Sequence, residues 1–231
     1  MSRPIPSRIV TAALSLTGLL AFAPAYSQTA GRNDAVASPS STAPAASPAP
    51  SPVKVAETGA ALRDLWLGHA FWVRNVVLET FAGNKPAAKA AEDQVVANAK
   101  QIAASIEPFY GKAANDKLLN LLVGHYGAVK QYLEASAAGD QAKQSAATQS
   151  LNANADEIAV FLSGANPNLP RDAVRSLIVA HGAHHVQQIQ QLNAKQYAQE
   201  AQTWEAMKKH MYVIADTLAG AIAKQFPAKF R

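Results

Sequence analysis

An internal repeat of 56 residues constrains the fold of this chain more than any other feature of its sequence. When the sequence is laid beneath itself with this shift, "LRDLWLGHAFWVRNVV" (62–77) falls over "LLNLLVGHYGAVKQYL" (118–133), and a second shift reaches "VRSLIVAHGAHHVQQI" (174–189). The match continues without a gap through a turn, where "AGN" (82–84) falls over "AGD" (138–140). Because such repeats bury their apolar faces against neighbouring copies, we expect three copies of one supersecondary unit.

Each copy has the pattern of two helices joined by a short turn. Apolar residues recur at helical spacing, as in Leu62, Trp66 and Val73, and lie on one helix face. The turns place glycine past a helix end and Asn84 or Asp140 at the start of the next helix. The sequence therefore predicts an all-α six-helix bundle of three αα-hairpins, which close around a pseudo-threefold axis or stack as an open array. The predicted hairpins span about 58–109, 112–165 and 169–227.

The second helices of the copies also align. "ANAKQIAASI" and "ANADEIAVFL" match without a gap, so Asn98 and Asn154 occupy one repeat position. An insertion of four residues brings "VIADTLAGAI" (213–222) beneath them. This alignment predicts that Ile214 replaces the two asparagines in the third copy.

The apolar face of the first helix in each copy carries a histidine at the same repeat position: His69, His125 and His181. His185 follows His181 by about one helical turn, so both side chains lie on one face. The spacing of His210 places it inward on the last helix. If the hairpins close around one axis, these imidazoles converge. We therefore predict five candidate metal ligands, with two asparagines orienting ring N–H groups around them. The candidates are His69, His125, His181, His185 and His210, and the asparagines are Asn98 and Asn154.

Such a cluster leaves three functions open. Three imidazoles and a fourth ligand are a common set for a divalent transition metal such as zinc, copper or iron. The first hypothesis is therefore an exported protein that binds a metal ion or a small ligand. The second is a structural or interaction module of the cell envelope, with inert core histidines that are each hydrogen-bonded to Asn, Trp or backbone. The third, with less support, is a metal-dependent hydrolase, whose general base the sequence does not identify.

Other functional classes lack the residues that they need. The chain has no cysteine, which excludes disulfides and thiolate metal sites. Its formal net charge is +5, but charges of both signs are interspersed without a basic stripe, which argues against nucleic-acid binding. The order of the histidines is similar to that of hemerythrin-like di-iron bundles, yet Val129 stands where a bridging carboxylate is needed. Nucleotide-binding and hydrolase signatures are absent from the sequence, so it does not indicate an enzyme.

Residues 1–27 have the pattern of a secretory signal peptide. Two arginines precede a short apolar run (9–22), and Ala25 and Ser27 fit the small-residue pattern of a cleavage site. The apolar run is shorter than the roughly 20 residues that span a membrane. We therefore expect cleavage after Ser27, no membrane span in the mature chain, and location in the periplasm or outside the cell.

The next segment, 28–57, is rich in Ala, Ser and Pro. It lacks the large apolar side chains that offset the entropy of ordering, so we predict a disordered spacer. The remaining residues, 58–231, are long enough for one helical domain with its own core.

Three stretches of the helical domain carry a resemblance to a known family: "LWLGHAFWVR" (65–74), "NADEIAVFLSGANPN" (154–168) and "ADTLAGAIAKQFP" (215–227). In combination they resemble an uncharacterised family of bacterial helical bundles, whose members are often labelled glycosyltransferase or acetylglutamate kinase. The resemblance covers about residues 62–229 and implies the three repeat-equivalent histidines, with an aspartate where this chain has Gln101. It implies no mechanism, and no nucleotide-sugar or ATP motif is present in these residues.

Overall fold

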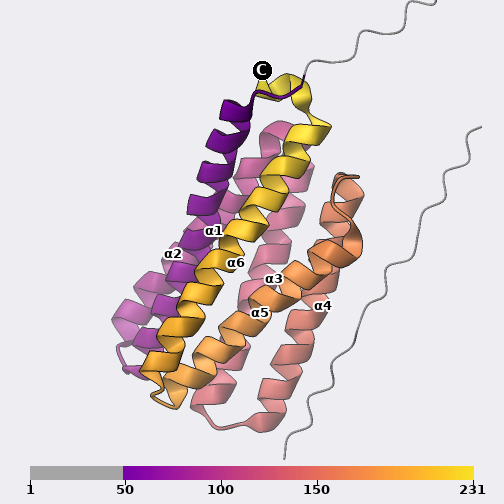
Figure 1. Ribbon diagram of the computed structural model, residues 1–231. Helices are drawn as coiled ribbons and strands as arrows, with labels where there is room; N and C mark the ends of the chain where they lie inside the picture. Colours follow the sequence, from indigo (N-terminus) through magenta and orange to yellow (C-terminus); the bar gives the residue numbers. More distant parts are fainter. Residues whose placement is uncertain (1–48) are drawn as a thin grey trace, which may run out of the picture. The chain divides into compact units, whose positions relative to one another are not determined.

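The computed structural model describes residues 49–231, which form six α-helices and a short 3-10 helix (Figure 1). The helices are α1 (Pro52–Phe81), α2 (Lys85–Tyr110), α3 (Lys112–Ala137), α4 (Gln141–Ala165), α5 (Arg171–Asn193) and α6 (Tyr197–Gln225), followed by η1 (Pro227–Phe230). These residues contain no strand, so the prediction of an all-α fold with six helices is confirmed. The predicted signal peptide and residues 28–48 of the predicted spacer lie outside the described residues.

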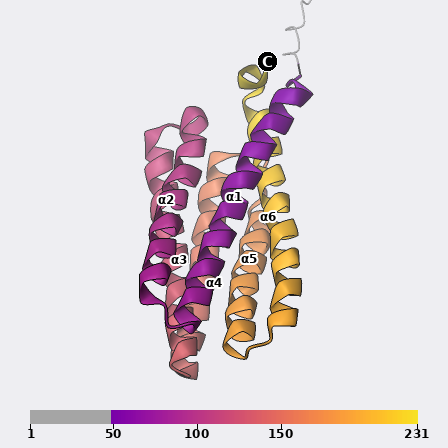
Figure 2. The ribbon, with the colours of Figure 1, turned by 90° about the vertical axis from the view of Figure 1, so that its left-hand side faces the viewer.

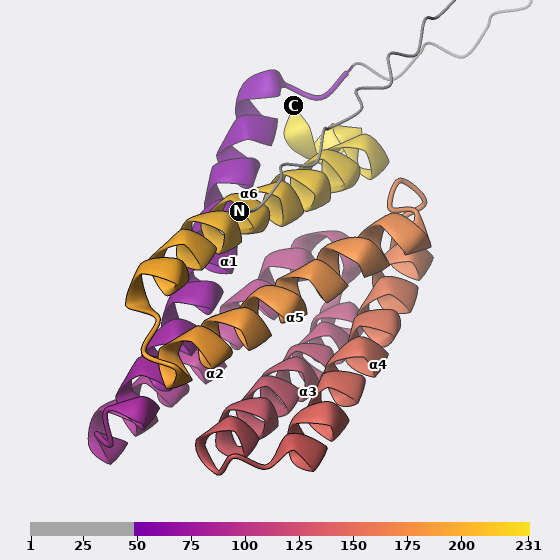
Figure 3. The same cartoon turned by 60° about the horizontal axis from the view of Figure 1, so that its bottom comes forward.

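The six helices pack in a closed ring that follows the order of the chain. Each helix packs against the next one, and α6 packs back against α1. Figure 2 shows α1 between α2 and α6, and Figure 3 shows α6 between α1 and α5. In addition, α5 contacts both α1 and α3. The hairpins therefore close around a common axis, where their first helices meet, and do not stack in an open row.

The hairpin turns use the residues that the repeat places there. Gly83 and Gly139 adopt positive φ values of 74° and 68°, which favour glycine. The side chains of Asn84 and Asp140 then cap α2 and α4 by accepting a backbone N–H. In the third turn the equivalent residue is Lys195, which has a positive φ of 56° although it is not glycine. The third hairpin therefore keeps the turn geometry without the residue that suits it best.

Helix α1 begins at Pro52, inside the range that was predicted to be spacer. Proline suits the first turn of a helix because the N–H that it lacks has no partner there. The N–H of Ser51 donates to the carbonyl of Phe230 at 2.7 Å, and Val55 packs against the small apolar cluster that contains Phe230. The C-terminal segment therefore supplies contacts to α1 that the composition of the N-terminal segment does not reveal.

Two large apolar clusters fill the bundle and divide it along its length. Helices α1, α3 and α5 each contribute to both clusters. The first cluster includes Trp66, Leu122 and Ile178, and the second includes Val73, Val129 and Ile189. On each helix, the repeat-equivalent histidine lies between these residues, so the three histidines form a polar layer between two apolar ones. None of the helices in residues 49–231 has an apolar stretch long enough to cross a lipid bilayer.

Candidate metal centre

Four buried imidazoles meet where α1, α3 and α5 approach one another. His69 comes from α1, His125 from α3, and His181 and His185 from α5. Each side chain is only 2–3% exposed, and one ring nitrogen from each lies within 4.8 Å of those of the others. The structure therefore brings together four of the five predicted ligands.

The spacing of the rings fits one shared ion. The centroids of the six pairs of rings are 4.4 to 6.2 Å apart. Four imidazoles that bind a tetrahedral zinc ion through bonds of about 2.1 Å have ring centroids about 5 Å apart. The observed spacings lie on both sides of that value, so the distances between the rings are compatible with one shared ion. The tightest pair is His181 and His185, whose Nε2 atoms lie 3.1 Å apart.

Burial keeps all four imidazoles neutral near neutral pH. Burial, aided by the neighbouring His125, lowers the pKa of His69 to about 3. Burial likewise lowers the pKa of His125 to about 4. The pKa values of His181 and His185 lie well below the usual histidine value, because of burial first and the neighbouring histidines second. A neutral imidazole carries one nitrogen lone pair, which is the form that binds metal ions.

Several of these ring nitrogens have no hydrogen-bond partner within residues 49–231. They are Nδ1 of His69, Nδ1 of His181 and both ring nitrogens of His125. Leaving a buried polar group unsatisfied costs about 1–3 kcal/mol, and native proteins rarely leave several together. A metal ion on the lone pairs would offset part of this cost, so the donor set fits such an ion.

The second helix of each hairpin binds the first through one recurring contact. A side chain on the second helix lies at hydrogen-bond distance from a backbone carbonyl 33 residues earlier in the chain. These contacts join Asn98 to Leu65 (3.0 Å), Asn154 to Leu121 (3.0 Å) and His210 to Leu177 (2.8 Å). In all three cases the carbonyl belongs to the residue four positions before the repeat-equivalent histidine. The Nδ2 groups of Asn98 and Asn154 donate to these carbonyls, and the predicted role of the two asparagines in orienting the imidazoles stays a prediction.

His210 thus occupies the position of the two asparagines in the third copy, and the prediction that Ile214 does so is wrong. The 56-residue shift runs without a gap as far as His210, so the inferred four-residue insertion is unnecessary. The error has a simple physical cause. Four residues make about one helical turn, so the apolar face stays in phase with or without the insertion.

His210 does not join the four buried imidazoles, although the sequence made it a candidate ligand. Its Nε2 lies against the carbonyl of Leu177, and its ring lies beside that of His184, with centroids 5.5 Å apart. Both rings are half-buried. His184 was not among the predicted ligands. Its position next to His185 in the sequence is the feature that could have pointed to it.

No aspartate or glutamate of the described part of the chain belongs to the histidine group. Glu200 is buried, but its carboxylate binds the guanidinium of Arg74 at 2.6 Å through two hydrogen bonds and also accepts one from Gln188. A catalytic zinc site needs an open coordination position and a general base nearby. Four imidazoles fill a tetrahedral site, so this arrangement suits holding a metal better than hydrolysis.

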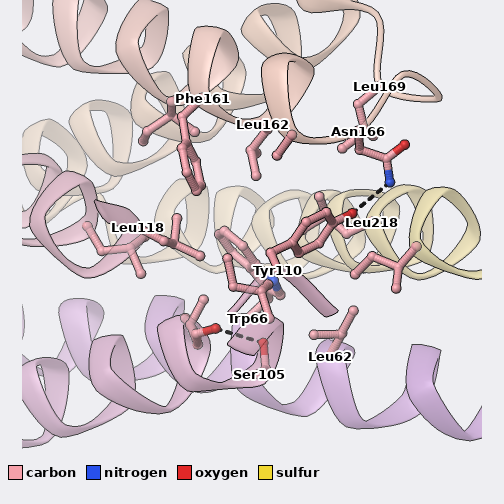
Figure 4. A pocket seen from close by; sticks show the side chains of 16 residues that line it. Leu62, Trp66, Ser105, Tyr110, Leu118, Phe161, Leu162, Asn166, Leu169 and Leu218 are labelled. Carbon is pink, nitrogen blue, oxygen red and sulfur yellow. Dashed lines mark hydrogen bonds between the residues drawn. The ribbon is translucent and has the colours of Figure 1, made fainter. Parts of the chain in front are cut away.

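Two small cavities share Trp66, Leu122 and Ile158 in their walls, and the smaller one borders the centre. The larger, of about 30 Å³, has mostly apolar walls, and a hydrogen bond of 2.9 Å from Asn166 to the hydroxyl of Tyr110 lies at its edge (Figure 4). The smaller, of about 10 Å³, is lined by Trp66 and by three of the four histidines. One water molecule needs about 10–15 Å³, so the space beside the imidazoles suits a single ion or water-sized molecule.

Comparisons of the chain with family models, with curated proteins and with solved structures found no match. The resemblance to a family of bacterial bundles therefore stays a prediction. The support for a function comes from the geometry of the histidines.

Proposed function

We propose that the protein binds one transition-metal ion through His69, His125, His181 and His185, and that Zn²⁺ fits the site best. The observation that carries this proposal is the convergence of four buried, neutral imidazoles on one point, with ring nitrogens that have no other partner among the described residues. Zinc takes four ligands in a tetrahedron and accepts imidazole nitrogen, and copper and iron also bind this donor.

The hypothesis of inert core histidines predicts a different arrangement. It requires each imidazole to pack separately and to hydrogen-bond with Asn, Trp or backbone. The four rings instead contact one another, and Asn98 and Asn154 direct their amide groups to backbone carbonyls. An apolar side chain of similar volume at each position would avoid the desolvation of four imidazoles, so packing alone does not account for them.

The proposed role is to hold the metal outside the cytoplasm. It combines the site with the predicted signal peptide, whose cleavage after Ser27 the mass of the exported protein would test. A binding role needs neither a general base nor an open coordination position. The enclosed site favours slow release over turnover, because an ion that leaves must cross the packed helices.

The test uses the full chain, purified without a histidine tag and stripped with a chelator. Elemental analysis after incubation with Zn²⁺, Cu²⁺ or Fe²⁺, followed by removal of free ions, should find one tightly held ion per chain. Free Zn²⁺ at 100 times its Kd should stabilise the fold by about 2.7 kcal/mol and raise the Tm by about 5–10 °C, because the ion binds only the folded state.

Substitution of single ligands separates specific from adventitious binding. His125→Asn and His69→Asn should each remove the tightly held ion and the rise in Tm, because the amide is a weak zinc ligand. His184→Gln is the matched control, since this ring lies outside the group of four, and it should keep both. A wild-type chain that takes up none of the three metals would refute the proposal. Equal metal content in His125→Asn and the wild type would refute it as well.

A further inference from the structure

The third hairpin carries histidines that the repeat does not require. The chain has six histidines, and the repeat accounts for three of them. The other three are His184, His185 and His210, and all lie on α5 or α6. His185 completes the buried centre, which leaves His184 and His210 as a half-buried pair outside it.

The geometry of this pair suits a metal ion. The two ring centroids are 5.5 Å apart, close to the distance of about 5 Å between two imidazoles that share a tetrahedral ion. The contact between Nε2 of His210 and the carbonyl of Leu177 puts the ring proton on Nε2 and leaves the lone pair on Nδ1. Metal-binding histidines usually donate their other N–H to a carbonyl or carboxylate in this way.

The contact to Leu177 does not by itself require a histidine. Asn98 and Asn154 make the equivalent contact in the other two copies. A Cβ on Gly68 or Gly124 would lie only 3.1 or 3.3 Å from the Nδ2 of the facing asparagine. The third copy has Ala180 in place of this glycine and His210 in place of the asparagine, so both positions have changed. The imidazole therefore adds a free ring nitrogen to a contact that an amide can make.

The pair also lies next to the buried centre. His184 is the neighbour of His185 in the chain, and the carbonyl that holds His210 is four residues before His181. In a helix, that carbonyl also accepts the backbone N–H of His181. Imidazoles therefore extend from the half-buried face of α5 and α6 to the buried group at the axis of the bundle.

We propose that His184 and His210 form an outer metal site that takes up the ion from solvent and passes it to the four buried histidines. This inference rests on the proposed metal binding. A hydrated ion loses its water stepwise as imidazoles replace it, and an ion held by the outer pair is already partly dehydrated next to its destination. The outer pair has two protein ligands against four, so it binds more weakly and releases the ion inward.

The experiment measures the rate of loading separately from the final occupancy. The metal-free full chain is mixed with Co²⁺ in a stopped-flow instrument, and the visible absorption of tetrahedral cobalt reports arrival at the buried site. One variant is His184→Gln. The second combines Ala180→Gly with His210→Asn, which reproduces in the third copy the glycine and asparagine of the other two. Unfolding curves of the metal-free chains verify that each variant folds.

We expect both variants to reach the wild-type content of buried metal but to load it more slowly, by about tenfold or more, because a nearby weak site raises the local concentration of the ion. Wild-type loading rates in both variants would overturn the inference and leave the proposed function intact. A loss of buried metal at equilibrium would also overturn it, because the residues would then belong to the inner site. Absence of metal binding by the wild-type chain would refute both proposals.

Discussion

Acid should unfold the metal-free protein at a pH where its carboxylates are still largely ionised. In the unfolded chain each histidine has a pKa of about 6.5. In the folded chain burial lowers the pKa of His69 to about 3 and that of His125 to about 4. The unfolded state therefore binds more protons between these values. The stability that the neutral imidazoles provide is complete above about pH 6.5 and is lost as the pH falls toward the folded pKa values.

The size of the effect follows from the two pKa values. A difference of one pKa unit corresponds to about 1.36 kcal/mol. At about pH 4.5, two units below the unfolded pKa, each of the two histidines therefore contributes about 2.5 kcal/mol less to the free energy of unfolding than it does at pH 7. Together they remove about 5 kcal/mol, which equals the whole stability of a marginal domain. His181 and His185 act in the same direction, since burial lowers their pKa values too.

Urea unfolding of the chelator-treated chain, followed by tryptophan fluorescence between about pH 7 and pH 4.5, measures this loss. The matched variant is His69→Gln, which removes one titrating group from the centre. The variant and the wild type need not have the same stability at neutral pH. Between about pH 7 and pH 4.5, the free energy of unfolding should fall by about 2.5 kcal/mol less in the variant than in the wild type. Equal losses in the two proteins would refute the reasoning, because the imidazole of His69 would then titrate alike in both states.

The same unfolding assay tests three further predictions. Gly127→Ala should stabilise α3 by about 1 kcal/mol through helix propensity because its Cβ meets no atom, whereas Gly68→Ala should bring no gain because its Cβ displaces a hydrogen-bonded amide. Equal gains would contradict the role of the close contact. Lys195→Gly should stabilise the third turn by about 0.5–1 kcal/mol, since its φ is 56°; a loss would contradict this. Arg74→Leu should cost about 3–5 kcal/mol because it leaves the buried carboxylate of Glu200 unpaired; a cost below about 1 kcal/mol would show that the pair behaves as an exposed one.

Much of the fold could be predicted because the repeat made local signals agree with one another. Gly83 and Gly139 marked two turns, and the structure finds both in the left-handed region with capping residues after them. Lys195 gave no such signal, because a lysine does not mark a turn in the way that a glycine does. The start of α1 at Pro52 was missed, because its partner, Phe230, is at the other end of the chain. Such distant contacts leave no periodic pattern in a sequence.

The candidate site was predicted less completely than the fold. Repeat equivalence placed His69, His125 and His181 on apolar helix faces, but a face alone does not decide whether hairpins close into a ring or stack in a row. The imidazoles converge because the six helices form a closed bundle. This closure depends on the packing of α6 against α1. The position of His210 was beyond a periodicity argument, because moving a helix by one turn leaves its apolar face unchanged.

The differences among the copies explain why four imidazoles and not three converge at the centre. Identical hairpins around an axis would supply three equivalent imidazoles and leave the fourth position of a tetrahedron to water. At the position of His185, the first two copies have Val73 and Val129, which pack in the apolar cluster beside the centre. A single copy with histidine there supplies the missing ligand, whereas three such copies would place six imidazoles around one point. The departure of the third hairpin from the repeat is therefore what adds a fourth imidazole to a layer of three core histidines, and four is the number of ligands that the proposed zinc site needs.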